Sequence, residues 1–276
     1  MSAGRQRQCK ATANKESKIW SSGSFHRGLS SPRADTLYAM NTQESATASQ
    51  ADQQTGPALE VVEIQTGPAV TAAVIWLHGL GADGHDFEPV VPQLLWPDAP
   101  DIRFVFPHAP VRPVTLNGGM AMRAWYDIVS LTSDRDQDQQ GIAQSVNQAA
   151  ALVRHERERG IAAERIVIAG FSQGGAIALQ LAIRYPETLA GLIALSTYML
   201  LDHRLESDRH EANKDLPIFV GHGTSDPMVP CFLGEMLAER MRGMGHPVEW
   251  HSYPMQHAVC PQEIADLSAW LRNYLT

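Results

Sequence analysis

The sequence lacks the features that mark membrane-spanning and disulfide-stapled secreted proteins. Its longest strongly apolar run, residues 189–201, is interrupted by a serine and a threonine and falls short of the roughly 20 residues that a helix needs to span a bilayer. Cysteine is scarce: Cys9, Cys231 and Cys260 are an odd number without the spacing of a disulfide framework. We therefore expect free thiols, a reducing compartment and no stable membrane insertion.

An excess of basic residues is also missing, because 22 lysines and arginines stand against 30 aspartates and glutamates, a net charge of -8. A chain this acidic repels phosphate backbones, so no nucleic-acid partner is expected. The charge is unevenly distributed. Residues 1–39 carry seven basic and two acidic side chains, a net charge of +5, whereas residues 40–276 carry 15 and 28, a net charge of -13.

The basic segment 1–39 has no apolar stretch of the kind found in secretory signals. Two interpretations stay open for it: an organelle transit peptide, or an extension translated from a start codon before Met40. The chain up to residue 57 has no core-forming pattern, so we expect a disordered extension over 1–57 and one catalytic domain over 58–276. A cytoplasmic location is expected, with organelle targeting by the first segment as the alternative.

From residue 58 on, short runs rich in Val, Ile and Leu alternate with helical patterns, which is typical of a mostly parallel sheet with helices on both faces. The predicted strands span residues 59–64, 72–77, 102–106, 165–169, 191–195, 216–220 and 248–253. The predicted helices include residues 142–153, 174–185, 232–241 and 262–274. The longest stretch without either pattern, residues 107–140, has the length of a functional loop or lid.

A G-x-S-x-G motif, Gly170 to Gly174, stands between a predicted buried strand and a predicted helix. That order is the one required for a nucleophile elbow, a tight turn that raises the serine above the sheet edge. Glycines two residues before and after the serine remove side chains that would collide in so tight a turn. The motif therefore makes Ser172 the candidate nucleophile.

A serine nucleophile needs a base, and the base needs an acid to hold its tautomer, in the chain order Ser, Asp, His for this kind of elbow. Asp226 follows the strand predicted over 216–220, and His257 follows the strand predicted over 248–253. Both therefore belong at the edge where the parallel strands end. His222 precedes the acid and His251 lies within a strand, so His257 is the expected base.

The glycines of the run His78 to Gly84 match G-x-G-x-x-G after a strand, which is also a dinucleotide-binding pattern. A dinucleotide site needs an acid at the end of the next strand, but Asp98 and Asp101 precede that strand. In a hydrolase the same loop supplies an oxyanion donor. We therefore expect the backbone N–H groups of Leu80 and Gln173 to form the oxyanion hole, and Gln173→Ala to cost little.

A zinc-helix motif fails at one position. His155 and Glu156 begin an H-E-x-x-H pattern, but Arg159 stands where the second histidine belongs. We expect no metal site, and interpret residues 155–158 as a solvated, charged helix end.

The motifs together resemble the bacterial carboxylesterases and acyl-protein thioesterases, members of the phospholipase/carboxylesterase family of α/β-hydrolases, from about residue 70 to the C-terminus. The resemblance is carried by the segments 77–81, 106–110, 113–120, 125–127, 170–175 and 226–230 and by the late His257. It implies a single-domain α/β-hydrolase without a large cap, with Ser172, Asp226 and His257 as the triad. It further implies an apolar acyl groove beside Trp125 and Met228, with core packing as the alternative role of Trp125.

We therefore expect a carboxylesterase that cleaves short- to medium-chain acyl esters through an acyl-enzyme, without cofactor. The same site could serve an acyl-protein thioesterase or a lysophospholipase. A nucleotide-dependent oxidoreductase and a catalytically silent binder of apolar ligands are the rival classes. The substrate is a small or protein-linked acyl ester, and a homodimer is one option for the oligomeric state, which the sequence leaves open.

Overall fold

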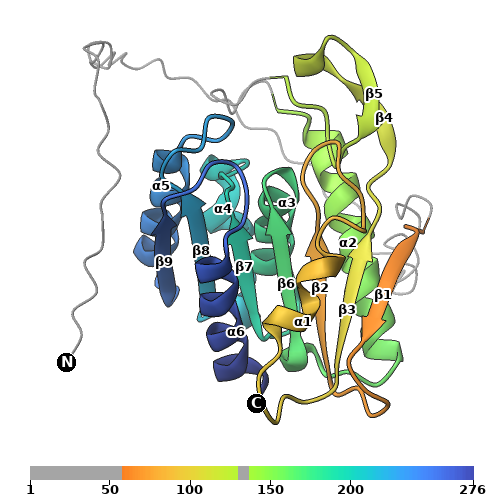
Figure 1. Ribbon diagram of the computed structural model, residues 1–276. Coiled ribbons are helices and arrows are strands. Elements are labelled where there is room, and N and C mark those ends of the chain that lie inside the picture. Colours follow the sequence, from red (N-terminus) through yellow and green to blue (C-terminus); the bar gives the residue numbers. More distant parts are fainter. Residues whose placement is uncertain (1–57, 130–136) are drawn as a thin grey trace, which may run out of the picture. The chain divides into compact units, whose positions relative to one another are not determined.

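One sheet of seven strands organises the part of the chain that the computed structural model describes, residues 58–129 and 137–276 (Figure 1). The predicted extension over 1–57 lies outside these residues. The strands lie in the order β1 (Val61–Gln65), β3 (Ile102–Pro107), β2 (Ala72–Leu77), β6 (Ile166–Phe171), β7 (Gly191–Leu195), β8 (Ile218–Gly223) and β9 (Val248–Tyr253). Strand β1 pairs antiparallel with β3, and the other six strands are parallel. The architecture is the predicted α/β fold.

Helices cover both faces of the sheet because its central strands have apolar residues on both sides. All residues of β2, β3, β6, β7 and β8 are buried. One face packs against α1 (Val91–Leu94) and α6 (Pro261–Leu275). The other packs against α2 (Gln139–Glu158), α3 (Gln173–Arg184), α4 (Asp202–Asp208) and α5 (Cys231–Gly243). The sheet lies between the helix layers (Figure 1), with one hydrophobic core on each of its faces.

The stretch expected to lack regular structure contains a hairpin. Strand β4 (Val111–Val114) pairs antiparallel with β5 (Met120–Arg123), and the turn between them includes Gly118 and Gly119, both with positive φ. Pro113 within β4 weakened the strand pattern in the sequence. The short helix α4 was missed as well. Neither element forms a cap domain over the sheet within the described residues.

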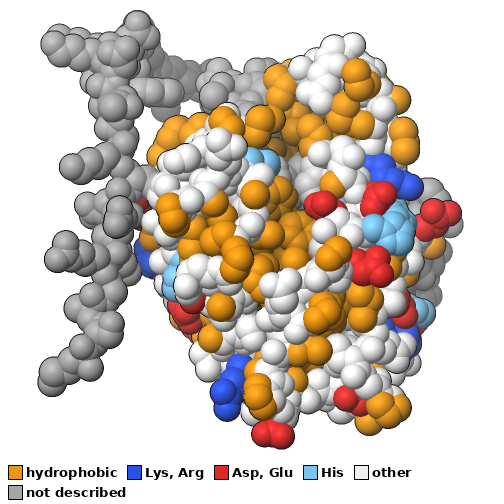
Figure 2. Space-filling model, viewed as in Figure 1, with side chains coloured by type: hydrophobic (Ala, Val, Ile, Leu, Met, Phe, Trp, Pro, Cys, Tyr) orange, Lys and Arg blue, Asp and Glu red, His pale blue; other side chains and the backbone are white. Residues whose placement is uncertain are grey.

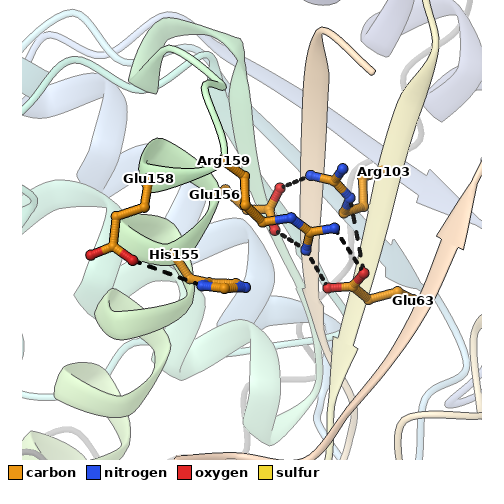
Figure 3. A network of polar contacts seen from close by, with 6 residues as sticks. All are labelled: Glu63, Arg103, His155, Glu156, Glu158 and Arg159. Atoms are coloured by element: carbon orange, nitrogen blue, oxygen red, sulfur yellow. Dashed lines mark hydrogen bonds and ion pairs between the residues drawn. The ribbon is translucent and has the colours of Figure 1, made fainter. Parts of the chain in front are cut away.

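One side chain at the charged end of α2 departs from the predicted solvated surface: His155, Arg157 and Glu158 are exposed, as expected, but Glu156 is buried. Glu156 is only 1% exposed and accepts hydrogen bonds from Arg103 of β3 (2.6 Å) and from Arg159 (3.0 Å). Arg159 also donates to Glu63 of β1, at 2.6 and 3.2 Å (Figure 3). We call Glu63, Arg103, Glu156 and Arg159 the α2 ion-pair network. It ties the end of α2 to the two strands at one side of the sheet.

The cysteines differ in state. Cys260 is a free thiol, as expected, whereas Cys231 is disulfide-bonded, so the prediction of free thiols is wrong for that residue. Cys9 lies outside the described residues. No helix among residues 58–129 and 137–276 has both the length and the apolar character needed to cross a membrane.

Candidate active site

Ser172 occupies the turn between the end of β6 and the first residue of α3. Its φ is 53° and its ψ is -122°, a sparsely populated positive-φ conformation that costs of the order of 1–3 kcal/mol in a non-glycine residue. Neighbouring backbone holds the turn: the Ser172 N–H donates to the Leu195 carbonyl (2.8 Å), and its own carbonyl accepts from the Thr197 hydroxyl (2.6 Å). The side chain is thereby presented at the carboxyl edge of the sheet.

The glycines of the elbow are required by close backbone contacts. A Cβ added to Gly170 would lie 2.4 Å from the Gly174 carbonyl oxygen, and one added to Gly174 would lie 2.3 Å from the Leu77 carbonyl oxygen. Helix α3 therefore packs its first turn directly on the end of β2. This close approach brings the elbow next to the loop that contains Leu80.

His257 bridges the serine and the buried aspartate. Its Nε2 lies 3.0 Å from Ser172 Oγ, and its Nδ1 lies 2.6 Å from Asp226 Oδ2. Since an ionised carboxylate can only accept, Nδ1 donates to Asp226, which leaves Nε2 of the neutral ring to accept the serine proton. The Phe171 ring packs 4.7 Å from the imidazole and limits its movement.

Asp226 is held as an anion. Its Oδ1 accepts from the N–H groups of Met228 and Val229, both at 2.8 Å. Burial alone would raise the pKa of this carboxyl, but hydrogen bonding with His222, His257 and the Val229 N–H outweighs burial and lowers the pKa to about 2. The carboxylate is therefore charged at neutral pH and able to orient His257.

His222, which its place before the acid excluded as the catalytic base, lies next to Asp226. Its side chain is fully buried, with Nε2 2.9 Å from the Val229 carbonyl oxygen and 3.5 Å from Asp226 Oδ2. The ring therefore supports the loop on which Asp226 is carried. Its position at the end of β8, four residues before an acid, was the available sign in the sequence.

The two proposed oxyanion donors lie in segments that meet at Ser172. Gln173 is the first residue of α3, where helix N–H groups have no intrahelical acceptor. A Cβ on Gly79 would contact Ser172 Cβ at 3.5 Å, so the loop with Leu80 lies against the nucleophile. Gly81 has a φ of 77° and donates its N–H to the Arg123 carbonyl of β5. This contact couples the loop to the hairpin.

The two predicted groove residues lie in different environments. Trp125 is 0% exposed, so the structure places it in the core, the alternative that its sequence left open. Met228 is 63% exposed, two residues after Asp226. Its contact with an acyl chain stays a prediction.

The Gln173 side chain has a role that the sequence did not reveal. It is buried, its Oε1 accepts from the Trp125 N–H (2.9 Å), and its Nε2 donates to the Tyr126 carbonyl (2.8 Å). The expectation that Gln173→Ala would cost little considered only the backbone donor. These two hydrogen bonds revise it, because truncation would leave buried backbone groups without partners.

The dinucleotide alternative lacks its acid at the glycine-rich loop. Asp101 accepts from the Ala69 N–H (2.7 Å) at the start of β3, and β3 pairs in parallel with β2, so this acid lies at the opposite edge from the loop after Leu77. No group of three or more metal-binding side chains occurs in residues 58–129 and 137–276. His155 instead pairs with Glu158 on the same helix.

Comparisons with known proteins point to one group of hydrolases. Residues 58–275 match the family described as phospholipase/carboxylesterase. The chain is 39% identical over 234 residues to acyl-protein thioesterase 1 of Cryptococcus neoformans, covering 79% of this chain and 98% of the relative. It is 38% identical over 214 residues to acyl-protein thioesterase 1 of Gibberella zeae, covering 74% and 91%.

Solved structures of similar fold include other proteins related to this chain in sequence. Arabidopsis thaliana SOBER1 is 31% identical with a TM-score of 0.69, covering 74% of this chain and 99% of that one. Zea mays acyl-protein thioesterase 2 is 26% identical with a TM-score of 0.69, covering 79% and 100%.

Proposed function

Because the chain belongs to the phospholipase/carboxylesterase family, we propose that Ser172, His257 and Asp226 are the triad with which it hydrolyses acyl esters. The enzyme is a serine hydrolase with the α/β-hydrolase fold. The observation that carries the assignment is the continuous hydrogen-bonded path from Ser172 Oγ through both nitrogens of His257 to Asp226.

Acylation begins when Ser172 Oγ attacks the acyl carbonyl carbon and its proton passes to His257 Nε2. The carbonyl oxygen becomes an oxyanion, which the N–H groups of Leu80 and Gln173 stabilise. Asp226 stabilises the imidazolium that forms. When the tetrahedral intermediate collapses, the bond to the leaving oxygen or sulfur breaks, and His257 returns the proton to that atom.

Deacylation repeats these steps with water as the nucleophile. His257 Nε2 removes a proton from water as the water oxygen attacks the acyl-enzyme carbonyl. The same two N–H groups hold the second oxyanion. The bond to Ser172 Oγ then breaks, the serine recovers its proton from His257, and the carboxylic acid leaves.

Apolar surface on two sides of the site favours an apolar acyl group. Strand β5 contacts the loop with Leu80, and the hairpin exposes Val111, Leu116 and Met120. Hydrophobic side chains gather at the upper right of the molecule, where Figure 1 places the hairpin (Figure 2). On the side of Asp226, Met228 and Phe232 are exposed. We assign short- to medium-chain acyl esters as substrates, with Met228 in contact with the acyl chain.

Acyl-protein thioesters are the second candidate substrates, because the relatives at 38–39% identity carry that activity in their names. Lysophospholipids remain a third. The discriminating measurement is kcat/KM for p-nitrophenyl esters from acetyl to dodecanoyl, for the matching thioesters, for an S-acylated peptide and for a lysophospholipid. An S-acylated peptide that is hydrolysed much faster than every oxygen ester would replace the first assignment by the second.

The triad itself is tested by labelling with a fluorophosphonate, which reacts with an activated serine. Wild type should be labelled stoichiometrically and Ser172→Ala not at all. A wild type that stays unlabelled under conditions in which it is folded would overturn the assignment.

We also propose a cytoplasmic enzyme, with a homodimer as the alternative to a monomer. Imaging of the full chain and of a chain without residues 1–39, each fused to a fluorescent protein at the C-terminus, tests the location. An organelle pattern that depends on residues 1–39 would contradict it. Light scattering in solution determines the oligomeric state.

A further inference from the structure

We propose that Trp125 is a positioning residue that holds the two oxyanion donors at a common distance from the substrate. The inference rests on the proposed function, because it concerns how the N–H groups of Leu80 and Gln173 are kept in place. Trp125 touches neither donor's hydrogen atom. It acts through the segments that carry them.

Every polar group of Trp125 is bonded to a different element of the fold. Its backbone N–H donates to Gln173 Oε1 at the start of α3 (2.9 Å), and its indole Nε1 donates to the His78 carbonyl after β2 (2.8 Å). Its carbonyl accepts from the Ser145 hydroxyl of α2. Trp125 therefore links both oxyanion segments to each other and anchors the pair to α2.

At the nucleophile elbow, Trp125 bonds to the side chain of Gln173, the residue whose backbone N–H is one of the two proposed oxyanion donors. The Gln173 amide is fixed at both ends, since Trp125 donates to its oxygen and its nitrogen donates to the Tyr126 carbonyl (2.8 Å). A buried amide with both ends bonded has one orientation. Because Gln173 is the first residue of α3, these bonds also restrain the backbone segment that carries its N–H.

At the glycine-rich loop, the Trp125 indole N–H donates to the His78 carbonyl, two residues before Leu80. The His78 ring holds the same segment, with Nδ1 donating to the Gly79 carbonyl (2.7 Å) and Nε2 accepting from the Ala109 N–H (3.0 Å). Burial lowers the pKa of His78 to about 4, so the ring is neutral and Nε2 is free to accept. The loop is thus fixed by the ring on one side and by Trp125 on the other.

The indole hydrogen bond is not a general consequence of burying tryptophan in this protein. Trp76 and Trp270 are as deeply buried, yet their indole nitrogens have no hydrogen-bond partner within the described residues. The backbone at this point is also crowded, because a Cβ on Gly174 would lie 2.4 Å from the same His78 carbonyl oxygen. Trp125 therefore bonds a carbonyl that lies where the loop after β2 packs against the first turn of α3.

The first test replaces Trp125 by phenylalanine, which keeps most of the buried ring and deletes the indole N–H. Removal of one oxyanion donor lowers kcat by about 10²–10³, so displacement of the donors should lower kcat by about tenfold to a hundredfold while KM changes by less than about threefold. The matched control is Trp270→Phe, which deletes an indole N–H without a described partner and should leave kcat unchanged.

The second test removes the other end of the link. Gln173→Met keeps the side-chain length but deletes both hydrogen bonds, and it should lower kcat in the same range. Its control is Gln180→Met on the same helix, where a buried amide donates to the Leu200 carbonyl away from the site. Ser145→Ala, a milder change, keeps the inference testable if Trp125→Phe does not fold, and should lower kcat about threefold.

A substrate-like ketone separates positioning from structural damage. A trifluoromethyl ketone forms an oxyanion adduct with the serine, whereas the matching methyl ketone binds without one. Affinity for the trifluoromethyl ketone should fall in proportion to kcat in Trp125→Phe, with affinity for the methyl ketone unchanged. Equal kcat in Trp125→Phe and Trp270→Phe would refute the inference while leaving the triad intact, whereas an unlabelled wild type would refute the triad itself.

Discussion

At the scale of single residues, the charge on Asp226 is set by its hydrogen bonds, and these determine what its neighbour His257 can do. Asp226→Asn places an amide against Nδ1 and allows the ring to adopt the other tautomer, with Nε2 protonated and unable to accept from Ser172. We expect kcat to fall by about 10⁴, the loss typical of this change in a serine triad. Steady-state kinetics with a p-nitrophenyl ester measures it. Asp215→Asn, at an exposed position, is the control, and a loss of less than tenfold would argue against Asp226 as the acid.

A second acidic residue, Glu263, has a raised pKa, whereas that of Asp226 is lowered. Glu263, near the start of α6, is 0% exposed, and neither of its carboxyl oxygens has a hydrogen-bond partner within the described residues. Burial, with a smaller contribution from the charge on Asp266, raises the pKa of Glu263 to about 8. The group is therefore mostly protonated in the folded enzyme at neutral pH.

This carboxyl predicts a pH-dependent stability. Between the pKa of the unfolded chain, near 4.5, and about 8, the folded state holds a proton that the unfolded state releases, so the free energy of unfolding falls as pH rises through this window. Glu263→Gln should remove that part of the fall. Urea unfolding at pH 5, 7 and 9 measures the difference between the two proteins. A difference that does not change with pH, or one equal to that of exposed Glu239→Gln, would contradict the raised pKa.

The G-x-S-x-G motif and the chain order of acid and base selected Ser172, Asp226 and His257, and His257 is within hydrogen-bond distance of the other two. The selection succeeded because each residue follows a strand that is recognisable by its apolar run. The indole direction of Trp125 and the side-chain bonds of Gln173 had no such local sign. Both depend on contacts between residues 47 or 48 positions apart. Hydrogen bonds of this range are products of packing, and a single sequence does not display them.

At the scale of elements, the α2 ion-pair network lies far from the chemistry. Arg103 pairs with Ala73 across β3 and β2, and Ala73 pairs with Ile166, the first residue of β6, whereas Ser172 follows the last residue of that strand. The network is therefore at the amino edge of the parallel strands. It should affect stability and not catalysis.

Glu156→Gln tests this separation. Two arginines would then face a neutral amide in a buried site, and loss of one partner of a buried ion pair costs about 3–5 kcal/mol. Chemical denaturation measures the change, and kcat per folded molecule should stay within about twofold. Glu158→Gln on the same helix, whose partner His155 is also exposed, should cost less than about 0.5 kcal/mol. Equal costs for the two variants would mean that the network contributes nothing.

All seven strands of the main sheet were predicted from the sequence, five of them are buried along their whole length, and three, β2, β7 and β9, have the predicted bounds. The hairpin β4–β5 was not predicted because its strands have four residues each, one contains a proline, and much of its apolar surface is exposed. Its pairing depends on the turn at Gly118 and Gly119 and on contacts with the loop after β2. Propensity and periodicity describe core elements well and elements at the rim of a site poorly.

At the scale of the whole molecule, we expect residues 58–276 to contain all that catalysis requires. The family match covers 58–275, and this part carries 15 basic and 26 acidic side chains, a net charge of -11. The shortened chain should have the kcat/KM of the full chain within about twofold. Both are assayed with and without dithiothreitol, since Cys231 is disulfide-bonded in the full chain. A large loss of activity in both conditions would assign a function to residues 1–57.

The backbone of Ser172 has a consequence for how such an enzyme evolves. Its positive φ is one that glycine adopts without strain, so Ser172→Gly should be inactive yet unfold at a higher temperature than Ser172→Ala. Natural selection for activity thus retains, at this position, a residue that selection for stability alone would discard. If a duplicated copy of the gene were no longer under selection for catalysis, selection for stability would favour glycine at position 172.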